Sequence, residues 1–151
     1  MFRDICESVD LDSQGQINGI VPRDVLLKPE SFNKPTFLVM KDGPATGLTV
    51  GCLTGMESFV CDSAGRESVE LAVYNFGFNM RPDQLRLPVF SARGDSGSLI
   101  IDGLGRMVGL LHAGTGRRGD VDISYATPMY WLWPRIKERY KDADFDFVIP
   151  S

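Results

Sequence analysis

The sequence predicts an all-β fold, a small antiparallel barrel or sandwich followed by one terminal helix. Six or seven short apolar runs follow one another at intervals of about ten residues, and turns rich in Gly, Pro and Asp separate them. Short, evenly spaced strands joined by such turns are typical of antiparallel barrels and sandwiches. Strands and helices do not alternate along the chain, so a doubly wound α/β fold is disfavoured.

The chain divides into an irregular segment, a barrel and a tail. Residues 1–34 are polar and interrupted by Gly and Pro, with a short strand predicted at 17–21. Residues 35–141 carry the strands and the helix, and residues 142–151 form the tail. The predicted strands of the barrel are 36–40, 48–53, 59–61, 69–76, 99–101, 107–111 and 123–127.

A helix is predicted from Pro128 to about Tyr140. Its apolar residues recur near helical spacing at Trp131, Leu132 and Ile136. Proline is tolerated in the first turn, where the missing N–H would have no partner. Pro134 is less comfortable and could kink the helix or delay its start.

Charge and length argue against several classes of partner. The net charge is −4 and no basic stripe is present, so neither nucleic acid nor an anionic membrane is an expected partner. Apolar runs fall far short of the roughly 18 residues that a membrane span needs. The first seven residues mix both charges and do not resemble a secretory signal.

Cysteine and histidine usage argues against disulfides and metals. Cys6, Cys52 and Cys61 are an odd number, and although the last two could pair across strands, buried reduced thiols are favoured. Together with the unremarkable N-terminus, this favours a cytoplasmic location. His112 is the single histidine and no Cys-x-x-Cys occurs, so we expect neither a zinc site nor a cofactor.

The chemistry-bearing segment is Gly-Asp-Ser-Gly-Ser at 94–98. A nucleophilic serine needs an exposed hydroxyl on a tight turn, beside N–H groups that can hold an oxyanion. Glycine before the serine allows the backbone to aim its N–H into the site. We therefore predict Ser96 as nucleophile, the N–H groups of Gly94 and Ser96 as oxyanion hole, and Asp95 as support for the turn.

Two further patterns surround this segment. After it come an apolar strand, the turn Asp-Gly-Leu-Gly at 102–105, and a second apolar strand that ends in His-Ala-Gly at 112–114. Before it, residues 41–51 read Lys-x-Gly-x-x-Thr-Gly-x-Thr-x-Gly. In this order over residues 35 to 140, these motifs resemble the C-terminal barrel of chymotrypsin-like (trypsin-like) serine proteases of the PA clan, in their microbial or fungal form.

The resemblance implies a six-stranded antiparallel Greek-key barrel with a C-terminal helix. It implies a serine endopeptidase, whose histidine base and aspartate come from an N-terminal barrel that nothing in this chain resembles. It places the primary substrate pocket along Phe90, Ser91, Arg93, His112, Ala113 and Gly114. The α/β-hydrolase elbow, Gly-x-Ser-x-Gly before a helix, does not fit, because Ser98 occupies its second glycine position and a strand follows.

Three of these residues have alternative interpretations. His112 could be the base, a pocket residue that favours acidic side chains, or, as favoured, a structural residue with a satisfied ring. Phe90 lies where trypsins carry their acidic specificity residue, which argues against Lys or Arg preference, but it could simply pack in the core. Asp95 in the family pairs with a new N-terminus after zymogen cleavage, and a plain turn-forming role is its alternative.

Three functions follow from the missing base. The first is a serine endopeptidase that cleaves peptide or protein substrates through an acyl-enzyme on Ser96, inactive as this chain until an N-terminal barrel is supplied. The second is a non-catalytic protease-like module that binds peptides or a partner, with an exposed apolar face that promotes self-association or pairing. The third is an incomplete gene product with no separate role.

Overall fold

The computed structural model describes residues 17–27, 37–61, 64–79, 89–115 and 123–145. The predictions for 1–16, 28–36 and 146–151 therefore lie outside the described residues. The elements within them are α2 (Arg23–Leu26), β1 (Phe37–Gly43), β2 (Gly47–Cys61), β3 (Glu67–Asn79), β4 (Leu99–Asp102), β5 (Met107–Gly114), β6 (Ile123–Pro128) and α3 (Met129–Arg139).

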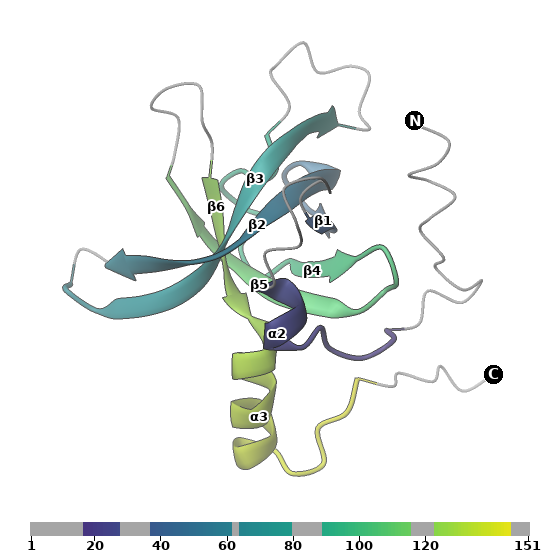
Figure 1. Ribbon diagram of the computed structural model, residues 1–151, viewed down its shortest axis with the longest axis vertical. Coiled ribbons are helices and arrows are strands. Elements are labelled where there is room, and N and C mark those ends of the chain that lie inside the picture. Colours follow the sequence, from purple (N-terminus) through teal and green to yellow (C-terminus); the bar gives the residue numbers. More distant parts are fainter. Residues whose placement is uncertain (1–16, 28–36, 62–63, 80–88, 116–122, 146–151) are drawn as a thin grey trace.

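The six strands close into an antiparallel barrel in the order β1-β2-β3-β6-β5-β4 (Figure 1). Neighbours in sequence pair along most of this order, and the pairing of β1 with β4 closes the circle. The helix α3 follows β6 directly. The expected six-stranded antiparallel barrel with a C-terminal helix is confirmed.

One long strand, β2, replaces the two strands predicted at 48–53 and 59–61. Its register against β3 shifts between Val50 and Gly51 and again between Leu53 and Glu57, and Gly55 between the latter has a φ of +77°. Such bulges bend a strand without ending it. The first part of β2 belongs to the barrel, whereas residues 57–61 and 67–70 form a ribbon that projects away from it (Figure 1).

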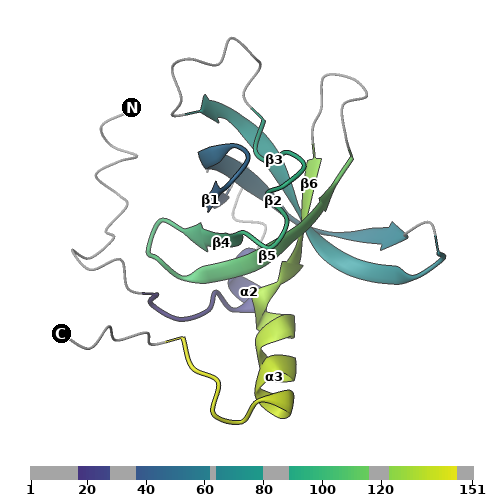
Figure 2. The same cartoon turned by 180° about the vertical axis from the view of Figure 1, so that it is seen from behind.

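The segment before the barrel contributes to the core. Val21 and Leu26 are buried in the same apolar cluster as barrel residues such as Val73, Val108 and Ile100. The predicted strand at 17–21 is reduced to a parallel bridge between Ile20 and Met107, with one hydrogen bond on either side of it. Both views show α2 next to the start of α3 (Figure 1, Figure 2).

The helix α3 occupies nearly the predicted range. Pro128 is its N-cap, and Pro134 lies inside the helix on an exposed position. No helix in the described part of the chain is long and apolar enough to cross a membrane.

Two of the cysteines lie in the described residues, and they form no disulfide. Cys52 is half-buried, and Cys61 is exposed on the ribbon. The expectation of buried thiols is therefore wrong for Cys61, because the ribbon carries it outside the barrel.

Gly51 tests the packing of the barrel wall. A Cβ on Gly51 would lie 2.6 Å from Val73 Cγ1, 2.7 Å from Phe90 Cδ2 and 2.9 Å from the Tyr74 carbonyl oxygen. We expect Gly51→Ala to lower the free energy of unfolding by about 1–3 kcal/mol through overpacking, measured by urea denaturation. Gly114→Ala is the matched control, because its Cβ would meet nothing closer than 3.4 Å; equal losses in the two variants would contradict the packing described.

Candidate active site

The turn that precedes β4 is shaped by its two glycines and its own backbone hydrogen bonds. Gly94 and Gly97 have φ angles of +110° and +91°, a region that residues with a Cβ rarely adopt. The Asp95 N–H donates to the Ala92 carbonyl at 3.0 Å, and the Gly97 N–H donates to the Leu111 carbonyl on β5 at 2.8 Å. The turn is thereby fixed to the neighbouring strand of the barrel.

The side chain of Asp95 is fully buried and well supplied with donors. Its Oδ1 accepts the N–H groups of Ala45 at 2.8 Å and Thr46 at 3.2 Å. Its Oδ2 accepts the Ala92 N–H at 2.9 Å and the Thr46 hydroxyl at 2.7 Å. The turn-supporting carboxylate is therefore held mainly by the β1–β2 hairpin.

Lys41 supplies the charge that balances Asp95. Its ammonium lies 3.5 Å from Asp95 Oδ2, and neither side chain is exposed to solvent. The same ammonium donates to Thr46 Oγ1 at 2.6 Å and to the Gly47 carbonyl at 3.1 Å. Lys41 is the first residue of the motif at 41–51, whose spacing indicated no role for it, and the buried ion pair provides one.

Burial and partners act in opposite directions on both members of this pair. Burial alone raises the pKa of Asp95, but hydrogen bonds from Ala92, Thr46 and Ala45 and the charge of Lys41 outweigh it, so the pKa lies below its usual value. Burial lowers the pKa of Lys41, and the charge of Asp95 offsets only part of that effect. Asp95 is thus a stable carboxylate at neutral pH.

Gly43 allows the two motifs to touch. A Cβ at this position would lie 2.5 Å from Asp95 Oδ1 and 2.8 Å from Ser98 Oγ. Any larger residue would push the Asp95 side chain away from the hairpin. Gly43 of the upstream motif is therefore a steric requirement of the serine turn.

Ser96 is exposed at the surface of this turn. Its hydroxyl donates to the carbonyl of His112 at 3.4 Å, the long end of hydrogen-bond range. Within the described residues, the N–H groups of Gly94 and Ser96 donate no hydrogen bond, whereas those of Asp95, Gly97 and Ser98 are all paired. The turn presents one hydroxyl next to two available N–H donors.

The ring of His112 is directed to a carboxylate. Its Nε2 lies 3.6 Å from Oε1 of Glu70 on β3, and no hydrogen bond joins the ring to Ser96 among the described residues. Glu70 is buried, although its position in a run of apolar residues gave no reason to expect a site there. The backbone carbonyl of His112 therefore lies beside Ser96, and the side chain of His112 lies beside Glu70.

The remaining predicted pocket residues are divided between core and surface. Phe90 is buried in the core cluster, and its ring centroid lies 5.7 Å from the Lys41 ammonium. Ser91 Oγ lies 2.6 Å from Ser124 Oγ.

Ser124, which contacts Ser91, lies on β6 beside two other residues of the predicted pocket. It pairs on β6 with Gly114, and Tyr125 pairs with Ala113. Arg93 is exposed. Ser91 and Gly114 are thus brought together through Ser124, and Phe90 packs inside the barrel.

Within the described ranges, no three His, Cys, Asp or Glu side chains gather closely enough to hold a metal ion.

The chain is similar to known proteins in its structure alone. No family model matches the sequence, and no curated protein matches it. The chymotrypsin of Cellulomonas bogoriensis is 19% identical with a TM-score of 0.49, over 82% of this chain and 52% of that one. A glutamic-acid-specific serine protease that uses a histidine triad in substrate binding is 18% identical with a TM-score of 0.46, over 71% and 48%. This chain spans about half the length of either structure.

Removing Lys41 tests the ion pair. Lys41→Met leaves the buried Asp95 without a counter-charge, and we expect the free energy of unfolding to fall by about 3–5 kcal/mol. Adding Asp95→Asn to this variant should cost less than the sum of the two single changes, because the pair is broken only once. Lys141→Met changes an exposed lysine and is the control; a similar small loss in both lysine variants would show that the pair is not coupled.

Acid titration tests the carboxylate separately. Since the pKa of Asp95 is lowered in the folded state, its stabilisation is complete above its unfolded pKa of about 3.9 and is lost as pH falls through the lower folded value. The unfolding free energy of the wild type should therefore fall more steeply below about pH 4 than that of Asp95→Asn. Glu57 also has a lowered pKa, but it is present in both proteins, so its contribution cancels in the difference between their two pH profiles. Parallel pH profiles would exclude the lowered pKa.

Proposed function

We propose that this chain is the nucleophile-bearing part of a serine endopeptidase. The observation that carries the proposal is the Ser96 turn, which has an exposed hydroxyl and two N–H groups, those of Gly94 and Ser96, that donate no hydrogen bond within the described residues. The buried Asp95–Lys41 pair supports the proposal further. Burying two charges has a desolvation cost, and here the buried pair holds a short surface turn in place.

In the proposed reaction, Ser96 Oγ attacks the scissile carbonyl and its proton passes to a base. The N–H groups of Gly94 and Ser96 receive the negative charge that develops on the carbonyl oxygen. One such donor contributes about 10²–10³-fold to kcat in related chemistry. The amine leaves, and water then hydrolyses the acyl-enzyme to release the second product.

The base for this reaction comes from outside the described residues in our proposal. The single histidine faces Glu70 by its Nε2, and the Ser96 hydroxyl donates to a carbonyl. A serine without its base retains only about 10³–10⁴-fold catalysis over water, from the oxyanion hole and substrate binding. We therefore propose that the chain acts with a second barrel that bears a histidine and an aspartate.

A non-catalytic module that binds a peptide or partner is the second candidate. The contact of Ser96 Oγ with the His112 carbonyl favours it, since this contact leaves the hydroxyl unactivated. The same two N–H groups would then bind a peptide carbonyl without attack on it.

A fluorophosphonate probe separates the two candidates. We expect the chain alone to label negligibly, and to label rapidly at Ser96 when a second barrel that bears the histidine and the aspartate is added. Ser96→Ala should abolish this labelling and reduce peptide cleavage by about 10⁶-fold, whereas the neighbouring Ser98→Ala should retain both.

Two outcomes would contradict the proposal. Rapid, stoichiometric labelling of the chain alone that is lost in Ser96→Ala would show that no second barrel is needed. A stable complex with such a second barrel that neither labels nor cleaves would exclude the endopeptidase and leave the binding module.

A further inference from the structure

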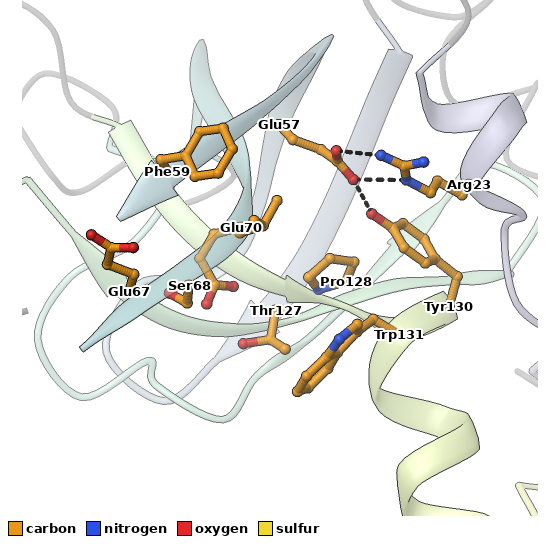
Figure 3. A pocket seen from close by; sticks show the side chains of 11 residues that line it. Arg23, Glu57, Phe59, Glu67, Ser68, Glu70, Thr127, Pro128, Tyr130 and Trp131 are labelled. Atoms are coloured by element: carbon orange, nitrogen blue, oxygen red, sulfur yellow. Dashed lines mark hydrogen bonds and ion pairs between the residues drawn. The ribbon is translucent and has the colours of Figure 1, made fainter. Parts of the chain in front are cut away.

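We infer that a groove on the outside of the barrel binds a partner protein through a basic side chain flanked by apolar ones. The groove has a volume of about 820 Å³ and lies between the projecting ribbon of β2 and β3 and the start of α3 (Figure 3). Its lining combines apolar side chains, among them Phe59, Val69 and Trp131, with three glutamates. The inference does not depend on catalysis by Ser96.

Glu70 is the acidic centre of this groove. The residue is only 4% exposed, and its Oε1 lies 3.6 Å from His112 Nε2. Its Oε2 is buried and has no hydrogen-bond partner among the described residues. A buried carboxylate oxygen without a donor is costly, and such atoms are normally paired. A ligand that brings an N–H donor to this oxygen would remove that cost.

The other charges around the groove leave it receptive to a cation. Glu57 is already neutralised, because Arg23 pairs with it at 2.6 Å and the Tyr130 hydroxyl donates to it. Glu67 is exposed on the ribbon and adds negative charge at the edge. Of the two remaining carboxylates, Glu70 lies beside the His112 ring and Glu67 lies at the exposed edge, so the complementary ligand is positively charged.

The apolar side chains indicate that the cation belongs to a protein. Phe59 is 86% exposed, and Val69 and Trp131 of the same lining are exposed as well. One exposed apolar residue is ordinary, but a group of them around an acidic groove is typical of a protein contact surface. Arginine suits such a place better than lysine, because its guanidinium bonds a carboxylate in a planar fork and lies well against aromatic rings.

The experiment uses the full chain and two short peptides. Acetyl-Leu-Arg-Leu-amide carries the cation, and acetyl-Leu-citrulline-Leu-amide has nearly the same shape without the charge. Backbone and indole resonances of the ¹⁵N-labelled chain report binding. We expect the arginine peptide to shift resonances of Phe59, Val69 and Trp131 and to bind at least about tenfold more tightly than the citrulline peptide, the usual gain from a charge-assisted hydrogen bond.

Matched variants assign the effect to Glu70. Glu70→Gln keeps the shape and should remove the preference for arginine over citrulline. Glu67→Gln changes an exposed carboxylate of the same groove and should alter the affinity by no more than about twofold. Phe59→Ser affects a largely exposed side chain, so the variant should fold. It should weaken the binding of both peptides to the same extent.

Three results would overturn the inference. The first is equal affinity for the arginine and citrulline peptides, or an unchanged preference in Glu70→Gln. The second is a set of shifts around Ser96 and Gly114 in place of the groove. The third is the lack of any saturable shift up to about 10 mM peptide. Any affinity would then be weaker than the millimolar end of specific binding.

Discussion

Asp95 and Lys41 lie 3.5 Å apart inside the protein, and the Thr46 hydroxyl bridges them. Two charges removed from water are expensive, and their attraction compensates only where hydrogen bonds satisfy the remaining donors and acceptors. Here the hairpin between β1 and β2 provides those bonds. The pair therefore ties a hairpin near the start of the barrel to a turn more than fifty positions later. The exposure of Ser96 and the positions of its neighbouring N–H groups depend on that connection.

The spacing of apolar runs was sufficient to predict the barrel, because alternation and Gly-rich turns are local signals. The bend in β2 was not predictable in the same way. Gly55, Glu57 and Ser58 interrupt the apolar pattern, so the pattern indicates two strands, whereas the chain bends at Gly55 with a positive φ and continues as one strand. The short helix α2 was also missed. Four residues give no periodic signal, and its burial arises from packing against the barrel.

For the site, the sequence identified the serine turn through motif order, and the structure shows why the motifs occur together: Gly43 leaves room for Asp95. The ionic partner of Asp95 could not be read from spacing, since it depends on how the barrel closes. Glu70 was missed for a related reason. Strand alternation places it on the outer side of β3, where exposure is the usual expectation. It is nevertheless only 4% exposed, and its side chain contacts His112 of β5, a strand that the sequence does not place relative to β3.

The barrel closes through a seam of three residue pairs between β1 and β4, and Lys41 opposite Ile100 is one of them. These strands are separated by most of the barrel sequence, and contacts between distant segments form slowly because loop closure costs entropy. Closure is also the event that brings the ammonium of Lys41 to Asp95. While the seam is open, Lys41 is not held beside Asp95, so the turn lacks its buried counter-charge. The turn that carries Ser96 thus depends on a strand pairing on the far side of the sequence, because the pairing of β1 with β4 sets the distance between Lys41 and Asp95.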